Sequence, residues 1–221
     1  MREIVLDTET TGLSPGEGHR VCEVACVELF NHVPTGRIFH RYVNPGRAMP
    51  EGARAVHGLT DEFLAQHPPF EAIAEELLLF LSEGRLVAHN AEFDIAFLNA
   101  EFALLGRPQL THEFEDTLAL ARKRYPGASN NLDALCKRFN IDTTAREKHG
   151  ALIDCHLLAS VYLELVGGRQ PGLDLAASLY GNGGADRARP ARPPRPHAAS
   201  PEEYALHVAF LTKIKTPIWS Q

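Results

Sequence analysis

The hydrophobic residues change their spacing part-way along the chain, and this change restricts the folds that the chain can adopt. In the first part, three segments rich in Val, Leu and Ile, at 3–7, 20–30 and 37–44, have the pattern of strands. Pro and Gly in 15–18 and 34–36 favour turns between these segments. The first part of the chain therefore predicts a meander of three strands.

From residue 70 on, apolar residues recur at the spacing of a helix. The segment 70–82 has a single apolar stripe, and short apolar segments then alternate with helical ones. The pattern predicts strands at 86–89 and 114–116, and helices at 70–82, 93–104, 117–124, 131–139 and 150–166. A meander followed by this alternation indicates an α/β fold, with a mixed β-sheet flanked by α-helices.

The composition changes again after Gly167-Gly168, so we expect a first domain over residues 1–169. Residues 176–200 are rich in Gly, Arg and Pro, and they predict a flexible linker because they cannot bury enough apolar surface to become ordered. The Arg residues there could touch DNA phosphates, although the composition favours a solvated linker.

Apolar residues return at 201–221, a tail too short to fold alone, so it must fold on a partner or on the first domain. The tail predicts a binding segment. Its apolar candidates are Tyr204, Leu206, Phe210, Leu211, Ile214 and Trp219.

Composition excludes several classes of protein. A net charge of −6 argues against a broad basic surface for nucleic acid, but not against a nuclease, whose active-site carboxylates count in that total. The four cysteines form neither a CxxC pair nor a zinc pattern, which predicts reduced, packed thiols. The sequence has no signal peptide and no apolar run long enough to span a membrane, so we expect a soluble, cytoplasmic protein with no membrane partner.

Four carboxylates and one histidine are the candidates for chemistry. Asp7 and Glu9 lie two apart at a strand end and share a face. Asp94 follows the strand at 86–89, and Asp154 interrupts an apolar helical turn with His149 five residues before it. Each alone has an ordinary explanation, such as a solvated acid, a helix N-terminal acid or a surface histidine.

Taken together, these residues indicate a metal-dependent reaction. Carboxylates held close to one another need bound cations, because their repulsion otherwise raises their pKa values until they protonate. Oxygen ligands of this kind suit Mg²⁺ or Mn²⁺. Two such ions activate a water and stabilise the leaving oxygen in phosphodiester hydrolysis, and His149 is suited to accept the proton of the water.

Three motifs carry a family resemblance. Residues 7–12 (DTETTG), 89–94 (HNAEFD) and 149–154 (HGALID) resemble the three motifs of the DEDDh exonucleases, and the H-x4-D spacing marks the histidine branch. The resemblance implies an RNase H-like fold and two divalent ions (Mg²⁺ or Mn²⁺). It also implies His149 as general base, Asp94 ligating directly or through water, and a metal-ligand set of Asp7, Glu9, Asp94 and Asp154.

Three other segments, 56–64, 131–136 and 164–168, resemble one branch of this family, the proofreading (epsilon) subunits of bacterial DNA polymerase III. That resemblance implies a 3′→5′ exonuclease acting on a DNA 3′ end, single-stranded or frayed. It also implies the catalytic (alpha) subunit of DNA polymerase III as a partner of the 201–221 tail.

The same resemblance gives candidate substrate-binding residues. Glu51 and His57 match positions near the bound nucleotide, although one extra residue lies between them here. Glu9, Thr10, His89 and Phe93 are further cleft candidates, and Phe93 is equally well explained as a core aromatic.

Residues 170–175 (QPGLDL) resemble the Q-x-x-L-x-L peptide that docks on the bacterial sliding clamp (beta). The expected contacts come from Gln170, Leu173 and Leu175. The alternative is a helix end that continues into a loop.

Two other functions remain open at this stage. The first is an RNA-trimming exonuclease with the same core, which would need neither linker nor tail. The second is a non-catalytic bridge between polymerase and clamp, which would have no reason to keep repelling acids together.

Overall fold

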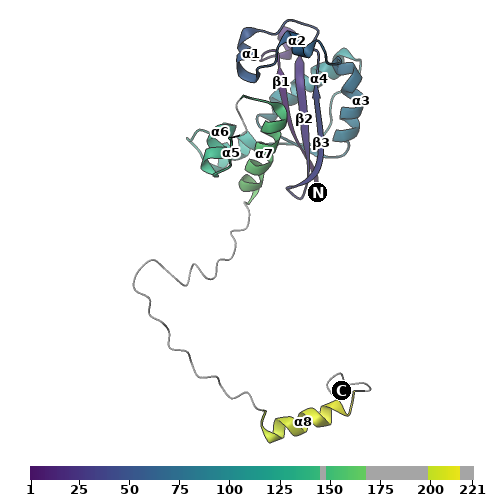
Figure 1. The fold of residues 1–221 in the computed structure, drawn as a ribbon, viewed down its shortest axis with the longest axis vertical. Helices are drawn as coiled ribbons and strands as arrows, with labels where there is room; N and C mark the ends of the chain where they lie inside the picture. The colour runs from purple at the N-terminus through teal and green to yellow at the C-terminus, as the bar shows by residue number, and fades with distance from the viewer. Residues whose placement is uncertain (145–147, 168–198, 215–221) are drawn as a thin grey trace. The chain divides into compact units, whose positions relative to one another are not determined.

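The computed structural model describes residues 1–144, 148–167 and 199–214. The chain divides into two compact units, Met1–Leu173 and Asp174–Gln221, which are drawn in Figure 1. The clamp-binding motif predicted at 170–175 and nearly all of the linker predicted at 176–200 lie outside the described residues. Both therefore stay predictions.

The first unit is built on a five-stranded sheet with the strand order β3-β2-β1-β4-β5 (Figure 1). β1 pairs antiparallel with β2, and β2 with β3, whereas β1–β4 and β4–β5 are parallel pairs. The sheet is therefore mixed, as predicted. The strands are β1 (Arg2–Thr10), β2 (Val21–Phe30), β3 (Val33–Tyr42), β4 (Arg85–Ala88) and β5 (Phe114–Asp116).

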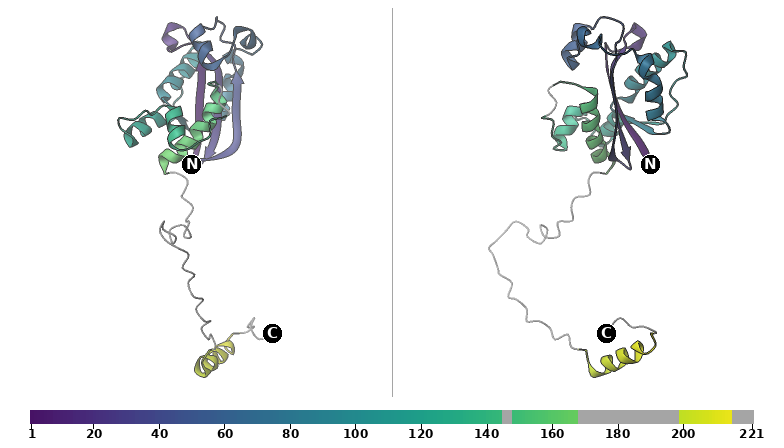
Figure 2. Two further views of the ribbon diagram at one scale, coloured as in Figure 1. Left: turned by 60° about the vertical axis from the view of Figure 1, so that its left-hand side comes forward. Right: turned by 45° about the vertical axis from the view of Figure 1, so that its right-hand side comes forward.

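Helices cover both faces of the sheet, as the edge-on view in Figure 2 shows. One face carries α3 (Phe70–Leu81) and α4 (Ala91–Leu104). The other carries α5 (Thr117–Arg124), α6 (Leu132–Arg138) and α7 (Ala151–Val166). These five helices match the predicted ones to within two residues at each end.

The side chains of β1 point alternately to the two faces of the sheet, and the core therefore has two layers. Ile4 and Leu6 pack with the α3 and α4 side, and Val5 packs with α7. All four cysteines are buried and free, as predicted. Each face of β1 is thus fixed to a different helical layer, which decides where its acidic residues point.

Two short helices near the end of the sheet were not predicted. They are α1 (Glu51–His57) and α2 (Asp61–Leu64). Neither is long enough to show a helical hydrophobic period, and α2 depends on its N-cap, the Thr60 side chain, which accepts a hydrogen bond from the Phe63 N–H. A 3₁₀ turn, η1 (Pro15–Glu17), stands where the first turn was expected.

The turn predicted at 34–36 is wrong. The β2–β3 hairpin instead turns at Asn31 and His32, both with positive φ, and Pro34 already pairs with Leu29. β3 is an edge strand, where a proline is tolerated because its missing N–H is not needed by a second neighbour.

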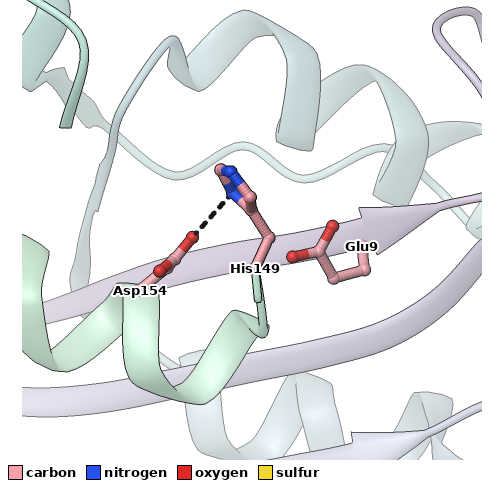
Figure 3. A group of neighbouring side chains, drawn as sticks. All are labelled: Glu9, His149 and Asp154. Atoms are coloured by element: carbon pink, nitrogen blue, oxygen red, sulfur yellow. Dashed lines mark ion pairs between the residues drawn. The ribbon is translucent and has the colours of Figure 1, made fainter. Parts of the chain in front are cut away.

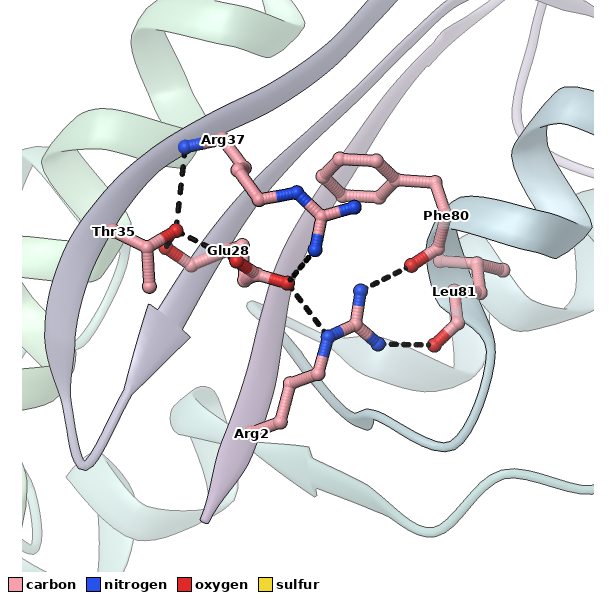
Figure 4. A network of polar contacts seen from close by, with 6 residues as sticks. All are labelled: Arg2, Glu28, Thr35, Arg37, Phe80 and Leu81. Atoms are coloured by element: carbon pink, nitrogen blue, oxygen red, sulfur yellow. Dashed lines mark hydrogen bonds and ion pairs between the residues drawn. The ribbon is translucent and has the colours of Figure 1, made fainter.

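A polar network joins three strands to α3 at the beginning of β1 (Figure 4). Arg2 donates to Glu28 at 2.6 Å and to the carbonyl oxygens of Phe80 and Leu81 at 2.5 and 2.8 Å. Glu28 also accepts from Thr35 at 2.7 Å and from Arg37 at 2.8 Å. The network fixes the end of the sheet that lies away from Glu9.

The described part of the second unit is a helix, α8 (Pro201–Leu211). Ser200 and Glu203 form a capping box at its start. Its large apolar side chains are exposed: Tyr204, Leu206, Val208 and Phe210. The sequence predicted an apolar tail here without its helix, and Trp219 lies outside the described residues. Within the described ranges, neither α8 nor any other helix is long and apolar enough to cross a membrane.

Candidate active site

Two of the candidate acids lie at the carboxyl end of β1. Asp7 and Glu9 alternate with buried neighbours and, like Val5, point to the face covered by α7. The strand continues to Thr10, three residues beyond its predicted end at Asp7. Strand alternation therefore brings these two carboxylates to one surface.

Asp154 and His149 approach Glu9 from α7. Asp154 lies in the first turn of α7 and is buried, and His149 precedes the helix and is exposed. His149 Nδ1 lies 3.3 Å from Asp154 Oδ2. Figure 3 shows both side chains and the Glu9 carboxylate turned toward one another, and ligand atoms of the three residues lie within 4.8 Å of each other.

Asp94 comes from the opposite helical layer. It is buried in the first turn of α4, and its Oδ1 accepts a hydrogen bond of 2.7 Å from the Thr8 hydroxyl. Thr8 lies between Asp7 and Glu9 and points to the other face of the sheet, so it links the two layers at the site. Asp7 and Asp94 do not belong to the 4.8 Å cluster of Glu9, His149 and Asp154.

The electrostatics indicate that all four acids share one region. Burial raises the pKa of Asp7 well above its usual value, and the charges of Asp94, Glu9 and Asp154 raise it further. Burial also raises the pKa of Asp94, to about 7, against hydrogen bonds from Thr8 that lower it. Without a cation, Asp7 and Asp94 therefore favour their protonated forms.

Sequence reasoning missed a fifth buried acid. Glu23 on β2 is the cross-strand partner of Glu9, and its charge also raises the pKa of Asp7. It lies 2.8 Å from Nε2 of His40 on β3, which compensates for its burial. The sequence could have indicated this residue, because Glu23 lies within the Val-rich segment 20–30, where a buried charge needs a partner.

Cys155 also has a structural position that the sequence did not suggest. Its buried Sγ lies 3.3 Å from the Ala25 carbonyl oxygen and 3.7 Å from that of Val5. The thiol thus joins α7 to β1 and β2 directly beside Asp154. Burial raises the pKa of this thiol far above its usual value, so it stays protonated.

A pocket of about 550 Å³ adjoins Glu9, and we call it the Glu9 pocket. Thr10, His57 and Phe93, all predicted cleft residues, line it. His57 is buried at the end of α1; its Nδ1 accepts from the Leu59 N–H, and its Nε2 lies near the Thr10 backbone without a hydrogen bond of normal geometry. The unpredicted helix α1 therefore supplies a wall of the site.

The rest of this pocket includes residues that were not predicted. His19 lines it and lies 3.2 Å from the Thr11 hydroxyl, and a Cβ on Gly12 would overlap the His19 ring. Leu13 also lines it, with 86% of its surface exposed. The sequence signal for His19 was Gly12 in the segment Thr-Thr-Gly. Because this glycine has no side chain, it leaves room for the His19 ring.

Two predicted substrate residues lie elsewhere. Glu51 begins α1 and is exposed, and it does not line the Glu9 pocket, although Pro50 and Gly52 do. His89 lines a separate pocket of about 500 Å³, which we call the His89 pocket. The sequence spacing placed both near the site but could not decide which cavity they face.

The donor atoms fit a divalent metal ion. Glu9 and Asp154 offer carboxylate oxygens within one small cluster, and the half-buried Asp7 and the buried Asp94 add negative charge that no Lys or Arg balances in the described contacts. Hard oxygen donors with uncompensated charge are the environment that such cations prefer.

Comparison with known proteins assigns the class. Residues 4–162 match the Exonuclease (RNase_T) family, and the chain belongs to that family. One solved structure that resembles it is the nuclease domain of a DEDDh family member, and DEDDh exonucleases use divalent metal ions.

Its relatives narrow the assignment. The chain is 52% identical over 174 residues to a DNA polymerase III subunit epsilon of Rickettsia felis, covering 77% of this chain and 76% of the relative. It is 47% identical over 176 residues to the DNA polymerase III subunit epsilon of Escherichia coli, covering 76% and 72%. Within the exonuclease family, it groups with the DNA polymerase III epsilon subunits.

Solved structures support the RNase H-like fold that was predicted. Exonuclease X in complex with 5′ overhanging duplex DNA superposes with a TM-score of 0.60 at 26% identity, covering 74% of this chain and 90% of that one. The nuclease domain of 3′hExo, a DEDDh family member bound to rAMP, superposes with a TM-score of 0.63 at 16% identity, covering 75% and 91%. The second likeness concerns the fold alone.

Proposed function

We propose that the protein is the proofreading 3′→5′ exonuclease of a bacterial DNA polymerase III, removing nucleotides from a DNA 3′ end. The main observation behind the proposal is a cluster of Glu9, His149 and Asp154, whose potential ligand atoms lie within 4.8 Å of one another. This cluster adjoins an open pocket of about 550 Å³. The sequence identity of about one half to named epsilon subunits supports the choice of this reaction among those of the fold.

The four acids Asp7, Glu9, Asp94 and Asp154 would hold two Mg²⁺ or Mn²⁺ ions, with Asp94 acting directly or through a water. When bound, the ions neutralise the carboxylates and stabilise the charge that develops on the phosphate oxygens. The chain's own contribution is positioning. Thr8 orients Asp94 by a hydrogen bond of 2.7 Å, and the Cys155 thiol fixes the turn of α7 that carries Asp154.

His149 would act as the general base. Asp154 Oδ2, 3.3 Å from Nδ1, orients the imidazole at the opening of the cluster. The side chain is 48% exposed, so it reaches the solvent from which the attacking water comes. A histidine in this place accepts the proton of the water as the water attacks the phosphorus.

The Glu9 pocket would hold the 3′-terminal nucleotide. His57 lines the pocket, and Phe93 and Leu13 offer apolar surface for the base or sugar. Glu9 belongs both to the pocket and to the acid cluster, so a nucleotide bound there has its phosphate beside the acids. Thr10 lines the same wall.

The direct test is hydrolysis of a 5′-labelled single-stranded oligonucleotide. We expect a ladder that shortens from the 3′ end one nucleotide at a time in Mg²⁺ or Mn²⁺ and stops with EDTA. Degradation that continues in EDTA, or internal cleavage, would contradict the proposal. A matched RNA strand tests the RNA-trimming alternative, and no hydrolysis of either strand would favour the non-catalytic bridge.

The tail would attach the exonuclease to the catalytic (alpha) subunit of the polymerase. In α8, Tyr204, Leu206 and Phe210 are 65%, 72% and 59% exposed. An 11-residue helix with this much exposed apolar surface is marginal alone and is stabilised by docking into a groove. Leu211, Ile214 and Trp219 belong to the same proposed surface.

Residues 170–175 would bind the sliding clamp through Gln170, Leu173 and Leu175. The support is the sequence motif alone, placed after α7. We expect a Gln170→Ala, Leu173→Ala variant to lose clamp affinity in a titration while keeping its rate on short strands. Equal affinity of variant and parent would remove this part of the proposal.

A further inference from the structure

The His89 pocket has no role in the function described so far. It has a volume of about 500 Å³ and is lined by His89, Leu118, Arg122, Gly127, Ala128, Asn130 and Asn131. We propose that it binds the nucleotide on the 5′ side of the scissile bond when a DNA single strand occupies the site. This inference rests on the proposed function, and it adds a second substrate position to it.

One short segment of the chain connects the His89 pocket with the Glu9 pocket and Asp94. The segment 89–94 contributes to both pockets: His89 lines one, Phe93 lines the other, and Asp94 follows Phe93 directly. Asp116, whose Oδ1 accepts from the Asn90 N–H at 2.9 Å, influences the pKa of both His89 and Asp94. A strand whose last nucleotide fills the Glu9 pocket would therefore continue along this segment to the His89 pocket.

Arg122 gives the pocket a cation for a phosphate. Its guanidinium is exposed at the edge and makes no ion pair or hydrogen bond within the part of the chain that the structure describes. Burial lowers the pKa of His89, and the charge of Arg122 lowers it further, so the two side chains lie near each other. In a chain with a net charge of −6, an exposed cation at the edge of this pocket is a place where a DNA backbone would gain affinity.

The wall of the pocket is held in place before any ligand binds. Asn130 is buried, and its side-chain amide donates to the carbonyl oxygens of Tyr125 and Ala128 at 3.1 and 3.0 Å. Arg138 donates to Asn130 Oδ1 at 3.2 Å and stacks over the Tyr125 ring at 4.4 Å. A preorganised wall loses little entropy when a nucleotide binds.

The lining suits a nucleotide better than an apolar ligand. Leu118 offers one apolar surface for a base or sugar, while His89 Nε2 is buried and makes no hydrogen bond of normal geometry with the described residues. The plainer explanation is a water-filled depression beside the start of α6, where Asn131 already caps the helix. That explanation predicts that changes in the pocket leave substrate binding unaltered.

The experiment compares two substrates of the full chain in Mg²⁺. The p-nitrophenyl ester of thymidine 5′-monophosphate fills only the terminal position, whereas a single-stranded oligothymidylate fills both. We expect Arg122→Ala to raise the KM of the oligonucleotide roughly tenfold, as for a lost charged hydrogen bond, with kcat and ester hydrolysis unchanged. The slope of log KM against log salt should fall by about 0.7 for one lost phosphate contact.

Lys123→Ala is the matched control, because Lys123 is an equally exposed cation on α5 that does not line the pocket. Ala128→Trp, which fills the pocket, should reproduce the oligonucleotide defect and spare the ester. A parental KM and salt slope in Arg122→Ala would overturn the inference, as would an equal loss on both substrates. Ester hydrolysis by the parent tests the proposed function separately.

Discussion

At the scale of single residues, the site depends on side chains that are costly to keep in a fold. Asp7, Asp94 and Glu23 are acids in or beside the core, and within the described residues only Glu23 pairs with a basic side chain, that of His40. Burying charge without compensation destabilises a protein. The cost of these acids to the metal-free protein can be measured.

One prediction concerns pH and Asp94. Its pKa in the folded protein is about 7, above the value of 3.8 for an unperturbed carboxyl, so the folded state binds this proton more tightly. The stabilisation is complete below the lower value and is lost as the pH rises through the higher one. In EDTA, the melting temperature of the parent should fall between about pH 4 and about pH 7.

Asp94→Asn, which keeps an acceptor for Thr8, should flatten this dependence while removing exonuclease activity. Thermal unfolding followed by circular dichroism across that pH range makes the comparison. Parallel curves for parent and variant would show that Asp94 does not carry the shifted titration.

A second prediction concerns His149. Replacement by alanine should lower kcat by about 10²–10⁴-fold, the usual contribution of a general base, without loss of metal binding by calorimetry. His156→Ala is the control, because His156 is an exposed histidine on the same helix. A kcat close to the parental one in His149→Ala would assign the proton transfer to another group.

At the scale of elements, the sequence predicted the helices whose apolar residues recur at a regular spacing over many residues. The helices at 70–82, 93–104 and 150–166 were found almost to the residue, because each buries a stripe of apolar side chains. The short helices α1 and α2 were not predicted. They are stabilised by capping and by contacts with distant parts of the chain, and they are too short to show a hydrophobic period.

The same distinction explains the site. Strand alternation brought Asp7 and Glu9 together, and helix position brought Asp154 near His149, so these could be predicted. The separation of His89 from the Glu9 pocket could not, because it depends on how the segments around β4 and α5 pack.

A third prediction tests the Arg2–Glu28 network. Burial alone would raise the pKa of Glu28, but hydrogen bonds from Thr35 and Arg2 outweigh it and lower this pKa. Glu28→Ala should therefore lower the free energy of unfolding in urea by about 1–3 kcal/mol, with kcat unchanged. The exposed pair Arg41–Glu76 is the control, and Glu76→Ala should cost less than about 1 kcal/mol. Equal effects would mean that the network adds no special stability.

At the scale of the whole molecule, the proposed catalytic residues and the proposed attachment helix lie in different units of the chain. The acids and both pockets belong to Met1–Leu173, whereas α8 belongs to Asp174–Gln221. A tether of this kind raises the effective concentration of the exonuclease at a primer end without altering its chemistry.

Truncation after Gly168 tests this division. The shortened protein should hydrolyse free single strands at the parental rate and should no longer co-elute with the polymerase catalytic subunit. In the full chain, Leu206→Glu with Phe210→Glu should have the same effect, since residues four apart share a helix face. Glu202→Gln in the same helix is the control. Continued co-elution of the truncated protein would place the attachment in the first unit.

The most direct measurement of the central claim is the single-turnover excision of a 3′-terminal nucleotide from a primer–template, with the end either paired or mismatched. The full chain in Mg²⁺ should remove the mismatched nucleotide faster, because a frayed end reaches the Glu9 pocket more readily. Asp7→Asn and Asp154→Asn should remove neither. Excision at the parental rate by either variant, or in EDTA, would contradict the assignment of these acids to a metal-dependent proofreading exonuclease.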